Sequence, residues 1–80
     1  MAKIVFPDNL LPTTQGKREA EISAENVREL LAELDARWPG CAELLGRCAI
    51  AIDGQIYQDA FLEPLSANSE VFFMPRSEGG

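Results

Sequence analysis

One amphipathic segment between residues 24 and 38 limits what this chain can fold into more than any other feature. Its apolar side chains recur at spacings of three, four and seven residues, which places them on one face of a helix: Val27, Leu30, Leu31, Leu34 and Trp38. We expect the hydroxyl of Ser23 to cap this helix and Pro39-Gly40 to end it. Because a single helical face needs another apolar surface to pack on, the rest of the chain must supply a sheet.

Segments rich in strand-forming residues lie on both sides of the helix. The expected order is strand, strand, helix, strand, short strand, strand, from segments 3–7, 17–22, 24–38, 48–52, 55–57 and 71–75. Asp53-Gly54 has the composition of a tight hairpin turn and residues 41–46 that of a short helical turn. Residues 7–16 and 59–70 have the composition of loops. This order predicts a two-layer α+β domain in which the helix crosses the sheet in the right-handed sense.

Length and charge narrow the class of protein. Eighty residues make one domain with a small core. The net charge of −6 argues against nucleic acid as a partner, because neutralising phosphates takes clustered Lys and Arg. An acidic surface fits a protein partner with a basic docking face, or serves only to keep a small protein soluble. Since the chain has no apolar run of about 18 residues and no signal-peptide core, we expect no membrane partner and a cytoplasmic location.

Few residues are suited to catalysis or metal binding. The chain has no His, and its two cysteines, Cys41 and Cys48, are too few for an ordinary zinc site. A disulfide is not expected in a reducing cytosol, so both cysteines are interpreted as small, buried apolar residues. Asp53 and Asp59 are better explained by turns than as an acid–base pair. The sequence therefore predicts a protein that is not an enzyme and binds no metal or cofactor of its own.

The last residues of the sequence carry a chemical signal. An apolar strand ends at Pro75, and Arg76, Ser77 and Glu78 separate it from Gly79 and Gly80. Glycine has no Cβ, so such a segment is thin and conformationally free, and residues 76–80 would reach roughly 15–18 Å when extended. It would fit a narrow channel in another protein and present a carboxylate there. Terminal glycines also occur in frayed ends and truncated linkers, so the two glycines alone do not show that the segment is functional.

Several segments together resemble a known family, the ubiquitin-like sulfur-carrier proteins of molybdopterin and thiamin biosynthesis. The resemblance rests on five segments: the strand KIVF, the helix ENVRELLAELDARWPG, the hairpin AIAIDGQI, the turn and last strand LSANSEVFFMP, and the final Gly79-Gly80. It implies a β-grasp fold: a mixed sheet of four to five strands on one main helix (about 24–38), in a domain of residues 1–75 followed by a flexible tail, 76–80. Family members of the molybdopterin branch usually carry two prolines and a small residue or two before the glycines, whereas this chain has Pro75-Arg76-Ser77-Glu78, which leaves the pathway open.

The resemblance implies a protein substrate. An adenylating enzyme of the ubiquitin-activating type, using ATP and magnesium, would activate the Gly80 carboxylate. A sulfur donor would convert it to a thiocarboxylate, which passes its sulfur to an acceptor enzyme such as the large subunit of a synthase. Arg76, Ser77, Glu78 and Gly79 would enter the partner with Gly80. Two alternatives stay open: a ubiquitin-like modifier conjugated through Gly80, and a β-grasp interaction module with an incidental diglycine.

A docking face is expected on the last strand. Alternate side chains of a strand point to opposite faces, so Val71 and Phe73 pair on one face and Phe72 and Met74 on the other. By resemblance, Val71 and Phe73 face the helix. Phe72 and Met74 would then be exposed beside the tail, together with Val5 and Pro7 from a neighbouring strand, as an apolar surface for partners. In the other possible register, Phe72 belongs to the core.

Overall fold

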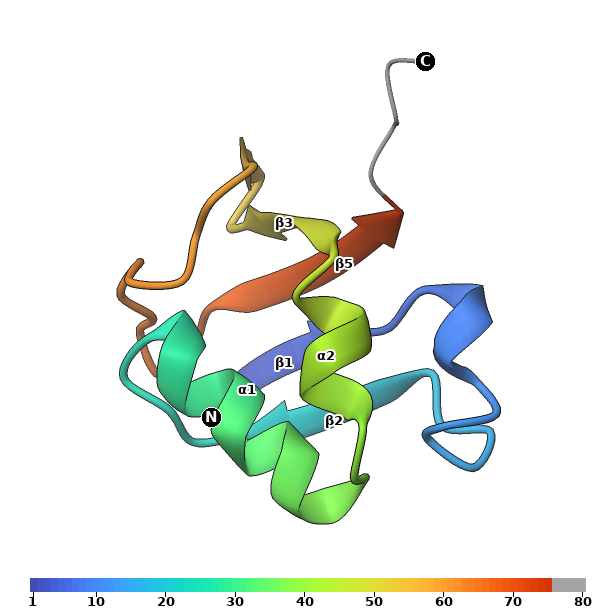
Figure 1. The fold of residues 1–80 in the computed structure, drawn as a ribbon. Helices are drawn as coiled ribbons and strands as arrows, with labels where there is room; N and C mark the ends of the chain where they lie inside the picture. The colour runs from blue at the N-terminus through green and yellow to red at the C-terminus, as the bar shows by residue number, and fades with distance from the viewer. Residues whose placement is uncertain (76–80) are drawn as a thin grey trace, which may run out of the picture.

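The predicted order of elements is confirmed. A computed structural model describes residues 1–75, and the predicted tail, 76–80, lies outside the described residues. The strands are β1 (Ala2–Val5), β2 (Glu19–Ile22), β3 (Cys48–Ile52), β4 (Gln55–Tyr57) and β5 (Glu70–Pro75), and the helices are α1 (Val27–Arg37), α2 (Cys41–Leu45) and the 3₁₀ turn η1 (Asp8–Leu10). Both helices pack on one face of the sheet, which gives the predicted two layers (Figure 1).

The sheet is mixed, as a β-grasp fold requires. Its five strands lie in the order β2-β1-β5-β3-β4. The first and last strands, β1 and β5, are adjacent and parallel at its centre, whereas β2, β3 and β4 pair antiparallel with their neighbours (Figure 1). The helical segment 27–45 connects β2 to β3 across one face, and no helix of residues 1–75 lies on the other face.

The core lies between that sheet and the helices. As predicted, β5 alternates: Val71 and Phe73 are buried, while Phe72 is 43% exposed. The alternative register, with Phe72 in the core, is therefore wrong. Neighbouring strands add Ile4, Ile22, Ile50 and Ile52 to the buried layer, and the helices contribute Val27, Leu30, Leu31, Leu34, Cys41 and Leu45.

The helix begins three residues later than predicted, because Asn26 caps it instead of Ser23. The side-chain oxygen of Asn26 accepts a hydrogen bond from the backbone N–H of Glu29 at 2.8 Å, and the Glu29 carboxylate accepts one from the N–H of Glu25 at 3.1 Å. This is a variant of the capping box. Residues 25–26 are held against 64–65 by the Asn26–Pro64 bridge and by a bond from Leu65 N–H to the Glu25 carbonyl, so Ser23 lies outside the helix and is exposed.

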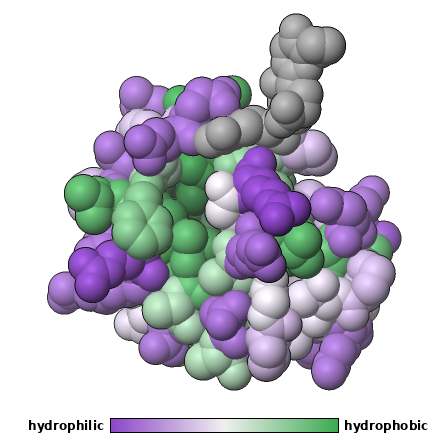
Figure 2. Space-filling model, in the orientation of Figure 1, coloured by the Kyte–Doolittle hydropathy of each residue, from purple (hydrophilic) through white to green (hydrophobic). Residues whose placement is uncertain are grey.

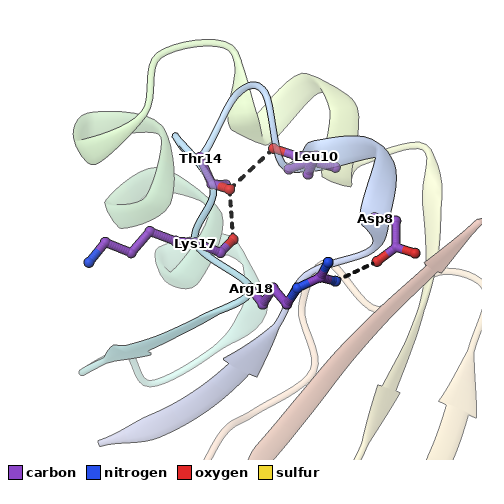
Figure 3. Close-up of polar contacts among 5 residues, drawn as sticks. All are labelled: Asp8, Leu10, Thr14, Lys17 and Arg18. Atoms are coloured by element: carbon purple, nitrogen blue, oxygen red, sulfur yellow. Dashed lines mark hydrogen bonds and ion pairs between the residues drawn. The ribbon is translucent and has the colours of Figure 1, made fainter.

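The segment between β1 and β2, predicted as an irregular loop, contributes to the core. Leu10, in η1, and Thr14 are fully buried. The Thr14 hydroxyl lies 2.7 Å from the carbonyl oxygen of Lys17 and 3.2 Å from that of Leu10, so the buried oxygen has partners (Figure 3). An ion pair of 2.9 Å between Arg18 and Asp8 joins the two ends of the segment on the surface (Figure 3).

The cap gives the first testable prediction. Replacing Asn26 by Ala removes the acceptor for the N–H of Glu29, so we expect the free energy of unfolding to fall by about 1 kcal/mol. The matched control is Ser23→Ala, which removes a hydroxyl that does not cap the helix and should change stability by less than about 0.5 kcal/mol. Urea denaturation followed by circular dichroism measures both. Equal losses in the two variants would contradict the assignment of the cap.

Candidate functional site

The outer face of the sheet, the face without helices, carries an apolar row. Phe72 of β5 lies beside Val5 of β1 and Ala51 of β3, and Ala51 lies beside Ile56 of β4. These four residues therefore form one line across four strands, which we call the apolar row. Phe72 and Ile56 are 43% and 62% exposed, and Val5 and Ala51 are partly exposed. A contiguous exposed apolar surface of this kind is typical of a protein-binding site.

The structure brings together three of the four residues predicted for docking. Met74 and Val5 are partly exposed on the same face as Phe72, and Met74 lies beside Ala49 of β3. The expected exposure of Pro7 is wrong, because Pro7 is buried where the chain turns from β1 into η1. Pro7 still lines a shallow groove at the end of β5, together with Phe6, Asp8, Asn9, Phe73, Met74 and Pro75.

Acidic side chains border the apolar row at one end. Glu19 of β2 lies beside Val5, and the next row along the sheet contains Glu21, Lys3 and Glu70. The ammonium of Lys3 lies 3.8 Å from the Glu19 carboxylate, and both side chains are about half exposed. The three carboxylates therefore outnumber the one cation at this border, which suits a partner whose apolar surface has basic residues beside it.

Sequence reasoning missed Ala51 and Ile56. A usable signal was present in the two-residue turn Asp53-Gly54, which places Ile52 beside Gln55 and therefore Ala51 beside Ile56. Because Ile52 faces the helix, the Ala51–Ile56 pair must face away from it. The hairpin register alone extends the predicted docking face to β4.

The two cysteines differ in their surroundings. Within residues 1–75 the two form no disulfide, and Cys41 is fully buried at the start of α2, as predicted. Burial, together with the nearby Asp35 carboxylate, raises the pKa of the Cys41 thiol to about 11. Cys48 was expected to be buried, but it is only partly buried, because it lines a hollow at the surface.

Within residues 1–75, the structure contains no group of three or more His, Cys, Asp or Glu side chains placed to hold a metal ion. Over the same residues, each helix is too short or too polar to cross a lipid bilayer. The described surface features are thus the apolar row, its acidic border and the groove at the end of β5. The groove includes Pro75, the last residue of β5, whereas the apolar row crosses this strand at Phe72 and the acidic border reaches its first residue, Glu70.

The comparisons agree with this geometry. The sequence matches the ThiS family over residues 4–80. The chain belongs to the ThiS family. This membership confirms the β-grasp sulfur-carrier family that the resemblance of its segments implied. No curated protein matches this ThiS-family chain significantly.

Solved structures show the same fold. A chain in the BexX/CysO complex of Amycolatopsis orientalis is 15% identical and has a TM-score of 0.87, with 100% of both chains covered. Small archaeal modifier protein 1 of Methanosarcina acetivorans is 21% identical, with a TM-score of 0.80 and 99% and 95% of the two chains covered. A chain in the complex of subunits 1 and 2 of the Helicobacter pylori molybdopterin-converting factor is 28% identical, with a TM-score of 0.68 and 99% and 97% covered.

The buried thiol gives a second prediction. In a Cys48→Ser variant, where Cys41 is the only cysteine, iodoacetamide should modify the native protein far more slowly than the urea-unfolded chain, because the buried thiol stays protonated. As the pH rises from 9 toward 11, the unfolded chain loses the thiol proton first, so stability should fall over this range. Mass spectrometry measures the modification. Equally fast modification of the native and unfolded forms would contradict the burial.

Proposed function

We propose that this chain is a sulfur-carrier protein whose reactive group is the carboxylate of Gly80. The observation that carries the proposal is the continuity of β5 with the diglycine segment. This central strand anchors the core through Val71 and Phe73, displays Phe72 and Met74, and leads directly into residues 76–80. The ThiS-family match, which extends through residue 80, supports the same assignment.

The proposed chemistry takes place on a partner enzyme that binds ATP and magnesium. An oxygen of the Gly80 carboxylate attacks the α-phosphorus of ATP, and pyrophosphate leaves. Sulfide then attacks the carbonyl carbon of the acyl-adenylate, and AMP leaves; with a persulfide donor the first product is an acyl disulfide, and a second thiol must reduce its S–S bond, leaving as part of a disulfide with the donor. The product is a thiocarboxylate whose sulfur is a nucleophile. Adenylation is needed because a carboxylate oxygen is a poor leaving group, and the partner supplies the electrostatic stabilisation of both steps.

This chain would contribute the reactive end and the docking face. The apolar row buries surface against the adenylating enzyme, while residues 76–79 carry Gly80 into its active site. Burying the exposed area of Phe72 and Ile56 supplies affinity, and the border of Glu19, Glu21 and Glu70 selects a partner with basic residues. The complex of the two Helicobacter pylori subunits supports a synthase large subunit as the sulfur acceptor.

A ubiquitin-like modifier is the second candidate, because the chain also shares its fold with small archaeal modifier protein 1. It would use the same acyl-adenylate but end in an isopeptide bond to a lysine of a target protein. Conjugates that survive thiol reagents and disappear when Gly80 is deleted would favour the modifier. Free protein bearing a thiocarboxylate would favour the carrier. A β-grasp interaction module would keep its function when Gly80 is replaced by Ala.

The proposed function is tested by intact mass. After incubation with ATP, magnesium, sulfide and a cognate adenylating enzyme, the mass should rise by the difference between one sulfur and one oxygen. Deletion of Gly80 should abolish this change, because the carboxylate that then ends the chain, that of Gly79, is one residue too short to reach the α-phosphate of ATP. An adenylating enzyme shown to be active on its own carrier is the control. With that enzyme active, an unchanged mass of the wild-type chain would refute the carrier assignment.

The docking role of the apolar row gives a further prediction. Phe72→Ser should raise the KM for this chain in ATP–pyrophosphate exchange by about tenfold, because a large exposed contact is lost while the fold is kept. The matched control is Ala36→Ser, on the exposed side of α1, which should leave the KM unchanged. Circular dichroism verifies that both variants are folded. Equal KM values for the two variants would place the enzyme elsewhere on the chain.

A further inference from the structure

A second exposed apolar surface lies on the helix side of the sheet. Phe61 and Leu62, in the connection between β4 and β5, are 50% and 75% exposed. Their backbone is fixed, since the Phe61 carbonyl accepts from the N–H of Arg28 at 2.9 Å and the Glu63 carbonyl accepts from the N–H of Val27 at 3.0 Å. The first turn of α1 therefore holds this short segment in place with two of its unpaired N–H groups. Two large apolar side chains are presented to solvent on a rigid support.

Beside Phe61 the surface is hollowed. The hollow has a volume of about 420 Å³, which is in the range of sites that bind small groups. Its floor consists of residues that otherwise belong to the core: Val27, Leu31, Leu45, Ile50 and Phe73. Figure 2 shows apolar side chains gathered on the left half of this face, around a recess. A void that opens onto core residues forfeits packing contacts, so an apolar side chain from outside would restore them.

The hollow lies near the end of β5 but on the opposite side of the sheet from the apolar row. Cys48, which lines the hollow, lies beside Pro75 in the strand register. Phe73 also contributes to the floor, whereas the adjacent Phe72 points to the outer face. A protein bound in the hollow would thus be close to Pro75 and would leave the apolar row free for another protein.

The charges around this surface identify the kind of partner. Asp59 lines the hollow, and Glu63 directly follows Leu62. Arg28 is the nearby cation on α1, and the guanidinium of Arg47 lies 3.4 Å from the Glu43 carboxylate, so that cation is partly neutralised. With a net charge of −6 the whole chain repels a second copy of itself and an anionic membrane, and attracts a basic segment.

We propose that the hollow and the adjacent Phe61-Leu62 form a second docking site, for a basic amphipathic segment of a partner protein that inserts one apolar side chain. Phe61 forms one wall around the inserted side chain, Leu62 extends the contact, and Asp59 and Glu63 face the basic residues of the segment. The site does not depend on the chemistry proposed for Gly80. It allows one partner to hold the chain from the helix side while a different one engages the outer face.

The experiment uses the full chain labelled with ¹⁵N and a synthetic amphipathic helical peptide of leucine and lysine. The expected result is a saturable change in the amide signals of residues 27, 31 and 59–62, also in a Phe72→Ser variant whose apolar row is impaired. Phe61→Ala should weaken binding about tenfold, since a wall of the pocket is lost. Asp59→Lys, an exposed position, should weaken it through charge alone and so remains informative if Phe61→Ala unfolds.

Two controls decide the occupant. A matched peptide with glutamate in place of lysine should bind much more weakly. The protein should not sediment with vesicles of phosphatidylglycerol. Signal changes confined to the outer face, equal binding of the two peptides, or sedimentation with the vesicles would each overturn the proposal. Thiocarboxylate formation at Gly80 is measured separately, so failure of the second docking site is distinguishable from failure of the proposed function.

Discussion

The parallel pairing of β1 with β5 is the constraint on which the rest of the structure depends. It joins the two ends of the folded domain at the centre of the sheet, where Ile4 and Val71 lie side by side with no solvent exposure. The three remaining strands flank this centre, with β2 beside β1 and the β3–β4 hairpin beside β5. The helices then cover the face of the sheet that carries the buried, alternate side chains of these two strands. Losing the pairing would separate the sheet into two hairpin-like halves with no common core.

Strand β5 serves the core and the surface at the same time. Val71 and Phe73 are buried, and the side chains between and after them, Phe72 and Met74, face outward. Leaving Phe72 and Ile56 exposed forgoes part of the roughly 1.5–3 kcal/mol that full burial of each side chain would contribute. A domain of this size has little stability to spare. In the proposed docking, a partner protein would cover these side chains and complete their contacts.

Much of the fold followed from the sequence. The stripe on α1, the order of elements and the alternation of β5 all have local periodicity that a single sequence displays. What failed depends on contacts between distant segments. Ser23 and Asn26 are equally good caps in isolation, and residues 64–65 decide between them by fixing residues 25–26. Leu10 and Thr14 are buried by the return of an irregular segment onto the core, for which no periodicity exists.

The candidate site was predicted in outline. The exposure of Phe72 follows from strand alternation, but the burial of Pro7 depends on how the chain turns after β1. The outward orientation of Ile56 could have been predicted from the hairpin register. The exposed position of Phe61 and Leu62 could not, because it depends on hydrogen bonds between their segment and the distant helix α1. The predicted tail lies outside the described residues, and its chemistry stays a prediction.

The direction of the two central strands also has a mechanical consequence. Since β1 and β5 run parallel, a pull on the chain beyond Pro75, resisted at Ala2, acts along both strands in opposite senses. The backbone hydrogen bonds between 3–5 and 70–72 are then loaded in shear, so they must break at the same time and not in sequence from one end. A partner that draws the end of this chain into a deep channel, or releases it again, would therefore pull against the strongest mechanical geometry that a sheet offers.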